Sequence, residues 1–302
     1  MIKVLILGRG YVGSYIHKKL EEVGNDYLTQ TGVMVESVAR REFDYVDINL
    51  LDEKIYCSDF KVRAFFARYD YVINCSGFTG RPNVDQGEKE PGLCYELNTF
   101  APLRVSNICQ IRNINYIHIS SGCIYTGYGK AWEEDDEPNF GLLNEESSTY
   151  SKSKHAYELA SNYGLTLRVR MPFCDTLHER SYLTKILNYD NLINLVNSKT
   201  YIPQLVDFIA HLITNEKEAK EKDTVNFVQP NALSTDKVTE IMTDHNLQNS
   251  KWNWVPFEEL GCIANRSNCV LSIDKLKKKY GFELLDEEVA ICQALTNIIK
   301  DE

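Results

Sequence analysis

Two residues with a spacing suited to proton transfer lie near the middle of the chain. Tyr150 and Lys154 are four residues apart, which on a helix places them on one face, about 6 Å apart along the axis. A lysine ammonium held there favours the phenolate and can lower a tyrosine pKa from ~10 towards neutrality. Such a tyrosine can give or take a proton at pH 7. The same spacing also occurs on ordinary surface helices, so it needs support from other residues.

That support comes from a serine at the end of an apolar run. Residues 116–120 predict a buried strand, and Ser121 follows directly. A hydroxyl at this strand end can hydrogen-bond the same substrate oxygen as Tyr150. Cys123 lies two residues further on and would point to the same face as Ser121 on an extended backbone. The sequence therefore predicts a site where Ser121, Tyr150 and Lys154 act on one oxygen, with a thiol beside them.

The N-terminal segment predicts a cofactor. Residues 2–7 form an apolar run typical of a central parallel strand, and Gly8, Gly10 and Gly13 separate it from a helical pattern. In this setting Gly8 makes the tight turn and Gly10 lets the backbone approach a pyrophosphate. Gly13 lets the helix pack on the strand, and the helix N-terminus offers N–H groups to the phosphates. The segment predicts a dinucleotide, and a plain tight turn is the alternative.

The next two strands bear on which dinucleotide binds. Residues 33–38 predict the second strand, and two arginines follow it, the first of them Arg40. Arginine at this position suits a ribose 2′-phosphate, whereas an acidic residue would bind a free 2′-hydroxyl. We therefore expect NADPH, with NADH as the alternative. Residues 71–75 predict the third strand, and the small residues Ser76 and Gly77 at its end would let a cofactor cross the strand tips.

The alternation of strands and helices predicts the fold class. Residues 1–170 alternate in this way, which indicates an α/β fold with a doubly wound parallel (Rossmann) sheet. Ligands bind at the carboxyl ends of such strands, where Gly10, Ser76 and Ser121 all fall. Longer loops begin after residue 170. We expect residues 171–302 to form a smaller substrate-binding lobe interleaved with the first domain.

Composition excludes several classes of protein. The chain has 302 residues, of which 43% are hydrophobic, enough for a large core. No run reaches the ~18–20 apolar residues of a membrane helix, and residues 2–7 enter the glycine turn directly, so we expect neither a membrane span nor a cleavable signal. A net charge of −10 disfavours nucleic acid. The nine cysteines include no C-x-x-C pair, so we expect no metal, reduced thiols and a cytoplasmic location.

These motifs together resemble the extended short-chain dehydrogenase/reductase family, whose catalytic serine, tyrosine and lysine correspond to Ser121, Tyr150 and Lys154. A closer resemblance is to the plant and giant-virus UDP-4-keto-6-deoxyglucose 3,5-epimerase/4-reductases, which complete the synthesis of UDP-L-rhamnose and are related to dTDP-4-dehydrorhamnose reductase. The stretches that carry this resemblance are residues 80–85, 121–125, 133–140, 168–172 and 266–268.

The closer resemblance implies a bifunctional enzyme acting on UDP-4-keto-6-deoxyglucose. A 4-keto sugar has acidic hydrogens at C3 and C5, so inverting both centres needs a base on one face and an acid on the other. Reduction of C4 then needs a hydride donor and a proton donor. Tyr150 would protonate O4, while Cys123 and Lys185 would be the two proton carriers, in an order that the sequence leaves open. The alternatives are an inert core cysteine and a solvated helix lysine.

The same resemblance implies the remaining contacts. The predicted cofactor contacts are Gly8, Gly10, Tyr11, Val12, Gly13, Arg40, Asp47, Asn74, Ser76, Gly77, Asn98, Tyr150 and Lys154. The predicted substrate contacts are Thr79, Arg81, Pro82, Asn83, Cys123 and Arg266. Arg266 is the best candidate for the diphosphate, because a guanidinium binds phosphate oxygens in bidentate fashion. Asn98 matches the helix asparagine that orders a proton-relay water in the family.

Three further expectations remain open. Arg168 and Arg170 either serve the substrate or pair with carboxylates of the sheet. The acidic run 133–137 is either a solvated loop or a cap on the site. A homodimer is the default assembly.

Two other functions also remain open. One is a reductase alone, resembling dTDP-4-dehydrorhamnose reductase, which leaves epimerisation to a separate enzyme; Cys123 argues against it. The other is a non-catalytic regulatory subunit, resembling the methionine adenosyltransferase β subunit. The intact set of Ser121, Tyr150 and Lys154 argues against this second reading.

Overall fold

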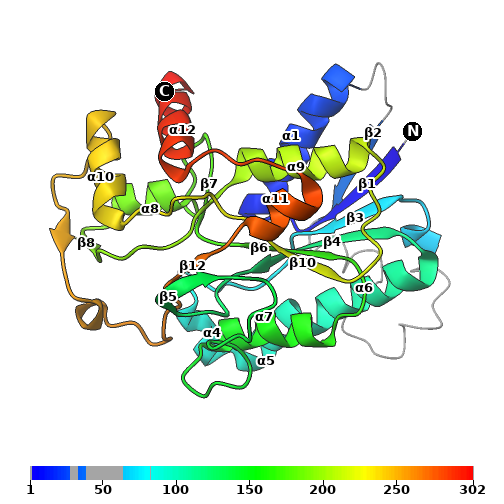
Figure 1. Ribbon diagram of the computed structural model, residues 1–302, viewed down its shortest axis with the longest axis horizontal. Helices are drawn as coiled ribbons and strands as arrows, with labels where there is room; N and C mark the ends of the chain where they lie inside the picture. Colours follow the sequence, from blue (N-terminus) through cyan, green and yellow to red (C-terminus); the bar gives the residue numbers. More distant parts are fainter. Residues whose placement is uncertain (1, 28–32, 39–63, 82, 302) are drawn as a thin grey trace.

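The computed structural model describes residues 2–27, 33–38, 64–81 and 83–301 (Figure 1). Three of the predicted contacts lie outside these residues, namely Arg40, Asp47 and Pro82. Their roles stay predictions.

A parallel sheet of six strands forms the centre of the described chain, in the order β10-β6-β4-β3-β1-β2. The strands are β1 (Ile2–Leu7), β2 (Val33–Val38), β3 (Tyr71–Asn74), β4 (Asn115–Ser121), β6 (Leu165–Val169) and β10 (Asp223–Asn226). The chain runs outward from β1 to β2 and then returns to β3 on the other side of β1. The strand order therefore reverses between β1 and β3, the place where doubly wound sheets bind ligands. The predicted α/β fold is confirmed.

Helices cover both faces of the sheet because the central strands are apolar on both faces. On one face, Val4 and Ile6 pack with residues of α1 (Tyr11–Tyr27) and α9 (Ile202–Thr214). Leu5 and Leu7 point the opposite way and pack with residues of α6 (Ala101–Arg112) and α7 (Thr149–Ala160). Figure 1 shows α1 and α9 above the sheet and α6 and α7 below it. The result is a three-layer domain with α7 lying beside the strand that ends at Ser121.

A smaller helical lobe packs beside the sheet. Its core joins α8 (Tyr182–Asn188), α10 (Thr235–Asp244) and α12 (Glu287–Asp301), which gather on one side in Figure 1. A buried ion pair of 2.6 Å joins Glu287, at the start of α12, to Lys199. The sheet extends past the predicted boundary at residue 170, because its strand β10 comes from the later part of the chain. The helix α9, which covers one face of the sheet, also comes from this part. The two regions share one core rather than meeting at a linker.

Shorter elements complete the described chain. They are α4 (Asp85–Lys89), α5 (Pro91–Tyr95), the π-helix η1 (Glu96–Phe100), β5 (Gly127–Trp132), β7 (Pro172–Phe173), β8 (Asn191–Leu192), β9 (Thr200–Tyr201), β11 (Asn253–Trp254), the 3-10 helix η2 (Phe257–Leu260), β12 (Cys269–Leu271) and α11 (Asp274–Tyr280). Parallel pairs join β7 to β9, β11 to β8 and β12 to β5. None of the helices in the described ranges has the length and apolarity needed to span a bilayer.

Candidate active site

The turn between β1 and α1 has the geometry of a phosphate-binding loop. Gly8 has a φ of +96°, and a Cβ added to it would lie 2.8 Å from the backbone nitrogen of Ser76. A Cβ on Gly13 would lie 1.9 Å from the carbonyl oxygen of Gly8, so the helix packs against the turn. A Cβ on Gly10 would meet nothing within 4 Å. The turn therefore leaves open space beside the free N–H groups of the first turn of α1, as a pyrophosphate requires.

The two residues after Gly10 use their side chains for packing. Val12 packs on the core, while the Tyr11 hydroxyl donates to Cys174 Sγ at 3.0 Å. The Tyr11 ring also stacks on His178, with 4.5 Å between the ring centroids. These contacts leave the backbone of both residues for the predicted cofactor contact, and they tie the turn to the loop that follows β7.

The end of β3 is held by its own polar side chains. Asn74 is completely buried, and its Oδ1 accepts from the backbone N–H of Ser76 at 3.0 Å. Its Nδ2 donates to the hydroxyl of Tyr116 at 3.0 Å. Asn74 is therefore placed to position Ser76, and its predicted contact with a cofactor stays a prediction. Gly77 is exposed. A cofactor that crosses the end of this strand needs such an exposed backbone.

Asn98 joins the segment after β3 to the neighbouring helices through hydrogen bonds. It lies in η1, a one-turn π-helix between α5 and α6, a feature frequent at functional sites. Its Oδ1 accepts from the N–H of Phe78 at 2.8 Å, and its Nδ2 donates to the carbonyl of Phe78 at 2.9 Å and to Ser153 Oγ at 3.1 Å. Its predicted contact with a relay water stays a prediction.

The start of α7 is fixed by two caps. Ser148 Oγ accepts from the N–H of Ser151 at 3.1 Å, the usual N-cap geometry. Glu88, on α4, accepts from the N–H of Thr149 at 2.7 Å. Tyr150 therefore stands in the first turn of the helix, and Lys154 follows one turn later on the same face. The position of Tyr150 depends on Glu88, which the sequence did not single out.

The structure brings the predicted catalytic residues together. Ser121 ends β4 and lies close enough to Tyr150 to lower the pKa of its hydroxyl. Lys154 is only 4% exposed, and its Nζ would lie 3.3 Å from a Cβ added to Gly77. No hydrogen-bond partner for this ammonium is found among the described residues. A buried ammonium beside an exposed strand tip fits a cofactor whose ribose hydroxyls would supply the missing partners.

The predicted lowering of the tyrosine pKa is wrong for the described protein. Burial raises the pKa of Tyr150 above its usual value, with a contribution from Cys123, and the hydrogen bond from Ser121 and the charge of Arg170 oppose this only in part. Burial likewise lowers the pKa of Lys154 to about 8, against the attraction of Glu158. Burial outweighs the expected charge effect because both side chains lie inside the protein. Tyr150 therefore holds its proton at pH 7, the form needed to protonate an oxygen.

Cys123 reaches the site by a different route from the predicted one. The strand ends at Ser121, and residues 122–124 form a turn in which the N–H of Cys123 donates to Ser121 Oγ at 3.2 Å. The backbone between Ser121 and Cys123 is therefore not extended, in contrast to the prediction. The thiol of Cys123 still lies beside Ser121, Tyr150 and Lys154. Its Sγ is 3.6 Å from Nη1 of Arg170.

The second predicted proton carrier comes from the smaller lobe. Lys185 lies half-buried on α8, and burial together with the charge of Arg180 lowers its pKa. Arg180 donates to Thr79 Oγ1 at 2.5 Å and to the carbonyl of Gly80 at 3.1 Å. Arg180, which sequence analysis missed, thus connects the segment before Lys185 to the loop that carries predicted substrate contacts.

A charged side chain beside that loop already has a partner. Arg266 forms an ion pair of 2.8 Å with Asp85 and donates to the carbonyl of Ala264. Asn83 accepts from the N–H of Asp85 at 2.9 Å, which starts α4, and Arg81 is exposed. Arg266 therefore lies beside the predicted substrate loop, but it shares its charge with a carboxylate. Its contact with a diphosphate stays a prediction.

Arg168, within β6, and Arg170, directly after it, differ in their partners. Arg168 donates to Glu158 Oε2 at 3.0 and 2.7 Å and to the hydroxyl of Tyr125. Arg168 therefore pairs with a carboxylate, but this carboxylate comes from α7 and not from the sheet. Arg170 has no such partner in the part of the chain described. It is 1% exposed and donates to the carbonyl of Gly122.

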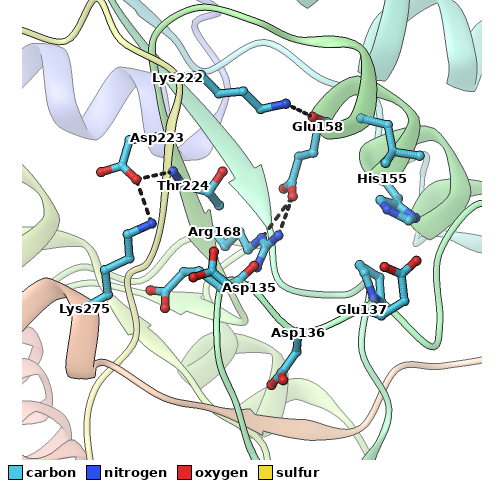
Figure 2. A pocket seen from close by; sticks show the side chains of 13 residues that line it. Asp135, Asp136, Glu137, His155, Glu158, Arg168, Lys222, Asp223, Thr224 and Lys275 are labelled. Carbon is cyan, nitrogen blue, oxygen red and sulfur yellow. Dashed lines mark hydrogen bonds and ion pairs between the residues drawn. The ribbon is translucent and has the colours of Figure 1, made fainter.

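A pocket of about 330 Å³ lies on another face of α7 (Figure 2). Its walls come from residues 134–138, from α7 and from β10, and Figure 2 shows the Arg168–Glu158 pair inside it. Apart from Arg168, none of the residues that the sequence predicts for the site lines it. The acidic run therefore encloses Arg168 instead of capping the site, and the main-chain carbonyl of Glu134 accepts from that guanidinium at 3.2 Å.

Fold and site together define an α/β protein of the dinucleotide-binding class, with a serine, a tyrosine and a lysine at the carboxyl ends of the strands. Residues 2–299 match the family described as the RmlD substrate binding domain. The chain belongs to that family.

Individual relatives agree with this assignment. The crystal structure of the L780 UDP-rhamnose synthase of Acanthamoeba polyphaga mimivirus superposes with a TM-score of 0.80 at 27% identity, covering 98% of this chain and 99% of that one. A bifunctional dTDP-4-dehydrorhamnose 3,5-epimerase/dTDP-4-dehydrorhamnose reductase of Arabidopsis thaliana is 29% identical over 91% of this chain and 87% of its own length.

A third protein shares the fold alone. The dTDP-4-dehydrorhamnose reductase of Bacillus anthracis, solved in complex with NADP, has a TM-score of 0.76 at 18% identity, with full coverage of both chains. The comparisons confirm the predicted resemblance, the fold and the expectation of an enzyme of this class.

Proposed function

We propose that this protein is a nucleotide-sugar 3,5-epimerase/4-reductase that converts UDP-4-keto-6-deoxyglucose to UDP-L-rhamnose. The observation that carries the proposal is the thiol of Cys123 beside the Ser121–Tyr150–Lys154 set. A reductase needs only the set of three. A half-buried thiol in the same site supplies a further proton carrier, which epimerisation requires.

Epimerisation would use the acidity that the ketone gives to its neighbouring carbons. Removal of a proton from C3 or C5 leaves an electron pair that delocalises onto the carbonyl oxygen. Ser121 and Tyr150 would hydrogen-bond this oxygen and stabilise its developing charge. Cys123 and Lys185 would exchange the protons, since one stands beside the catalytic set and the other comes from the smaller lobe.

Reduction would use the same oxygen. Tyr150, which burial keeps in its phenol form, would protonate O4 as the C–H bond forms at C4. NADPH, when bound, supplies the hydride. Lys154 would hold the nicotinamide ribose, because its buried ammonium lies under Gly77. The glycine turn at Gly8, Gly10 and Gly13 would hold the pyrophosphate.

Several finer assignments belong to the same proposal. Arg266 would bind the diphosphate, with Thr79, Arg81 and Asn83 around the sugar. NADPH is preferred over NADH on the strength of Arg40 and of the NADP held by the Bacillus anthracis protein. We further propose that the protein is a cytoplasmic homodimer and that the base of its nucleotide-sugar substrate is uridine. We also propose that residues 171–302 supply the smaller substrate-binding lobe, which is interleaved with the cofactor domain.

A test by substrate pairs separates the proposal from a reductase alone. The purified protein is given UDP-4-keto-6-deoxyglucose or, separately, the already epimerised UDP-4-keto-L-rhamnose, each with NADPH. The proposal expects UDP-L-rhamnose from both. Turnover of the second compound alone would show a reductase without epimerase activity. No turnover of either, with NADPH bound, would reject the proposed substrate.

A further inference from the structure

The loop 174–181, between β7 and α8, is attached to the helix that follows the phosphate-binding turn. At its start, Cys174 Sγ accepts from the hydroxyl of Tyr11 at 3.0 Å. Further along, the ring of His178 stacks on the ring of Tyr11, with 4.5 Å between the centroids and 20° between the planes. Tyr11 is the first residue of α1, so His178 lies beside the end of that helix where the backbone N–H groups are free.

The same loop also reaches the segment that follows β3. Arg180 donates to Thr79 Oγ1 at 2.5 Å and to the carbonyl of Gly80 at 3.1 Å. Tyr11 follows β1, whereas Thr79 and Gly80 follow β3, and the strand order reverses between these two neighbouring strands. The loop therefore spans the crevice in which a doubly wound sheet binds its ligand.

His178 is exposed but held in a defined position. Its N–H donates to Thr184 Oγ1 at 3.2 Å, and its carbonyl accepts from the N–H of Ser181 at 2.8 Å. Its ring Nδ1 accepts from the N–H of Arg180 at 3.0 Å. A neutral imidazole carries one proton, so the acceptor role of Nδ1 places that proton on Nε2. Among the residues that the structure describes, none accepts this Nε2 proton.

A fixed N–H donor at this place suits an anionic oxygen. The first turn of α1 and the open space at Gly10 already favour a pyrophosphate. A donor whose orientation is set before binding loses little freedom when the ligand arrives. Packing on Tyr11 would be served equally well by a phenylalanine. What the imidazole of His178 adds is the acceptor for Arg180 and the unused donor.

We propose that His178 binds the cofactor by donating its Nε2 proton to an oxygen of the pyrophosphate, and that Arg180 is the positioning residue that orients the ring. The contact would add one charge-assisted hydrogen bond to those of the glycine turn. The inference rests on the cofactor placement in the proposed function and is independent of the sugar substrate.

The test measures NADPH affinity by fluorescence titration at about pH 8, where an ordinary imidazole is neutral. Two variants separate the donor from the acceptor. His178→Gln places an amide N–H near the position of Nε2 and should keep the affinity within about threefold of the wild type. His178→Asn places its amide oxygen near the position of Nδ1, which keeps the acceptor for Arg180 and removes the outer donor. Its Kd should rise by about tenfold.

A role in holding the loop alone predicts the reverse order, with the Asn variant normal and the Gln variant weakened, and that result would overturn the proposal. Equal affinity in all three proteins would overturn it as well. A second ligand, 2′-phospho-ADP-ribose, keeps the pyrophosphate and lacks the nicotinamide, so its Kd should change by the same factor. A loss confined to NADPH would contradict a contact with the pyrophosphate.

His17→Asn is the matched control, because His17 lies on the same helix and its ring faces Glu21 at 3.5 Å. NADPH affinity should be unchanged in this variant. If neither His178 variant folds, the wild type decides by NMR. The Nε2–H resonance of His178 should be protected from solvent exchange with NADPH bound, and a resonance that stays unprotected would overturn the proposal. No sugar is present, so normal NADPH binding with no effect of His178 would reject this inference and leave the proposed function standing.

Discussion

Replacement of Lys154 by methionine should make the protein more stable while abolishing its proposed activity. Lys154 is 4% exposed and has no hydrogen-bond partner in the described chain. The folded protein therefore carries a poorly solvated ammonium, which a bound cofactor would satisfy. A methionine of similar length removes the charge and keeps the packing volume.

The size of the effect follows from the pKa of Lys154. Folding lowers it from an ordinary 10.5 to about 8, mainly through burial. Each tenfold change in proton affinity is worth about 1.4 kcal/mol, so the buried charge costs about 3 kcal/mol below pH 8. Between pH 8 and 10.5 the unfolded chain binds the proton and the folded protein does not, so the penalty shrinks as the pH rises. The stability gained by Lys154→Met should shrink over the same window.

Urea unfolding of the wild type and of Lys154→Met at about pH 7 and about pH 10 measures this difference. The matched control is Lys152→Met, two residues earlier on the same helix, where the lysine only donates to the carbonyl of Glu145 at the surface. We expect a gain of about 3 kcal/mol at pH 7 for the first variant and a change below about 0.5 kcal/mol for the second. A destabilised Lys154→Met protein would refute the reasoning, because it would show that the ammonium is well solvated or paired.

Three other substitutions test separate parts of the account. Tyr150→Phe should slow NADPH oxidation by at least about 100-fold while NADPH still binds, and an unchanged rate would exclude Tyr150 as the proton donor. Glu158→Gln leaves Arg168 without its carboxylate and should lower the free energy of unfolding by about 3–5 kcal/mol in urea; a change below about 1 kcal/mol would mean the pair is well hydrated. Gly13→Ala places a Cβ 1.9 Å from the carbonyl of Gly8, so fluorescence titration should show NADPH affinity reduced by about tenfold or more, and normal affinity would show that the turn relaxes.

Local geometry explains which features the sequence could predict. The roles of Gly8 and Gly13 follow from a turn of six residues, and the structure confirms a positive φ at the first and no room for a Cβ at the second. The N-terminal position of Tyr150 on a helix is equally local. The parallel sheet follows from the alternation of apolar strands and helices. Patterns of this kind depend on residues close together in the chain.

Features that depend on tertiary contacts could not be predicted. The pKa of Tyr150 rises because the whole site is buried, which the spacing to Lys154 does not encode. Arg168 and Arg170 look equivalent on an alternating strand, yet only the first meets a carboxylate, because Glu158 comes from α7. The pairing of Arg266 with Asp85 joins residues that are far apart in the sequence. Each of these outcomes is set by which elements the fold brings together.

The central claim is that epimerisation and reduction share one site, and proton exchange tests it most directly. The protein is incubated with UDP-4-keto-6-deoxyglucose and NADPH in D₂O, and the product is read by NMR. The account predicts UDP-L-rhamnose with deuterium at both C3 and C5, and Cys123→Ser should lose this exchange. A C4-reduced sugar with hydrogen retained at both carbons would contradict the claim and leave a reductase alone, with Cys123 an ordinary core residue.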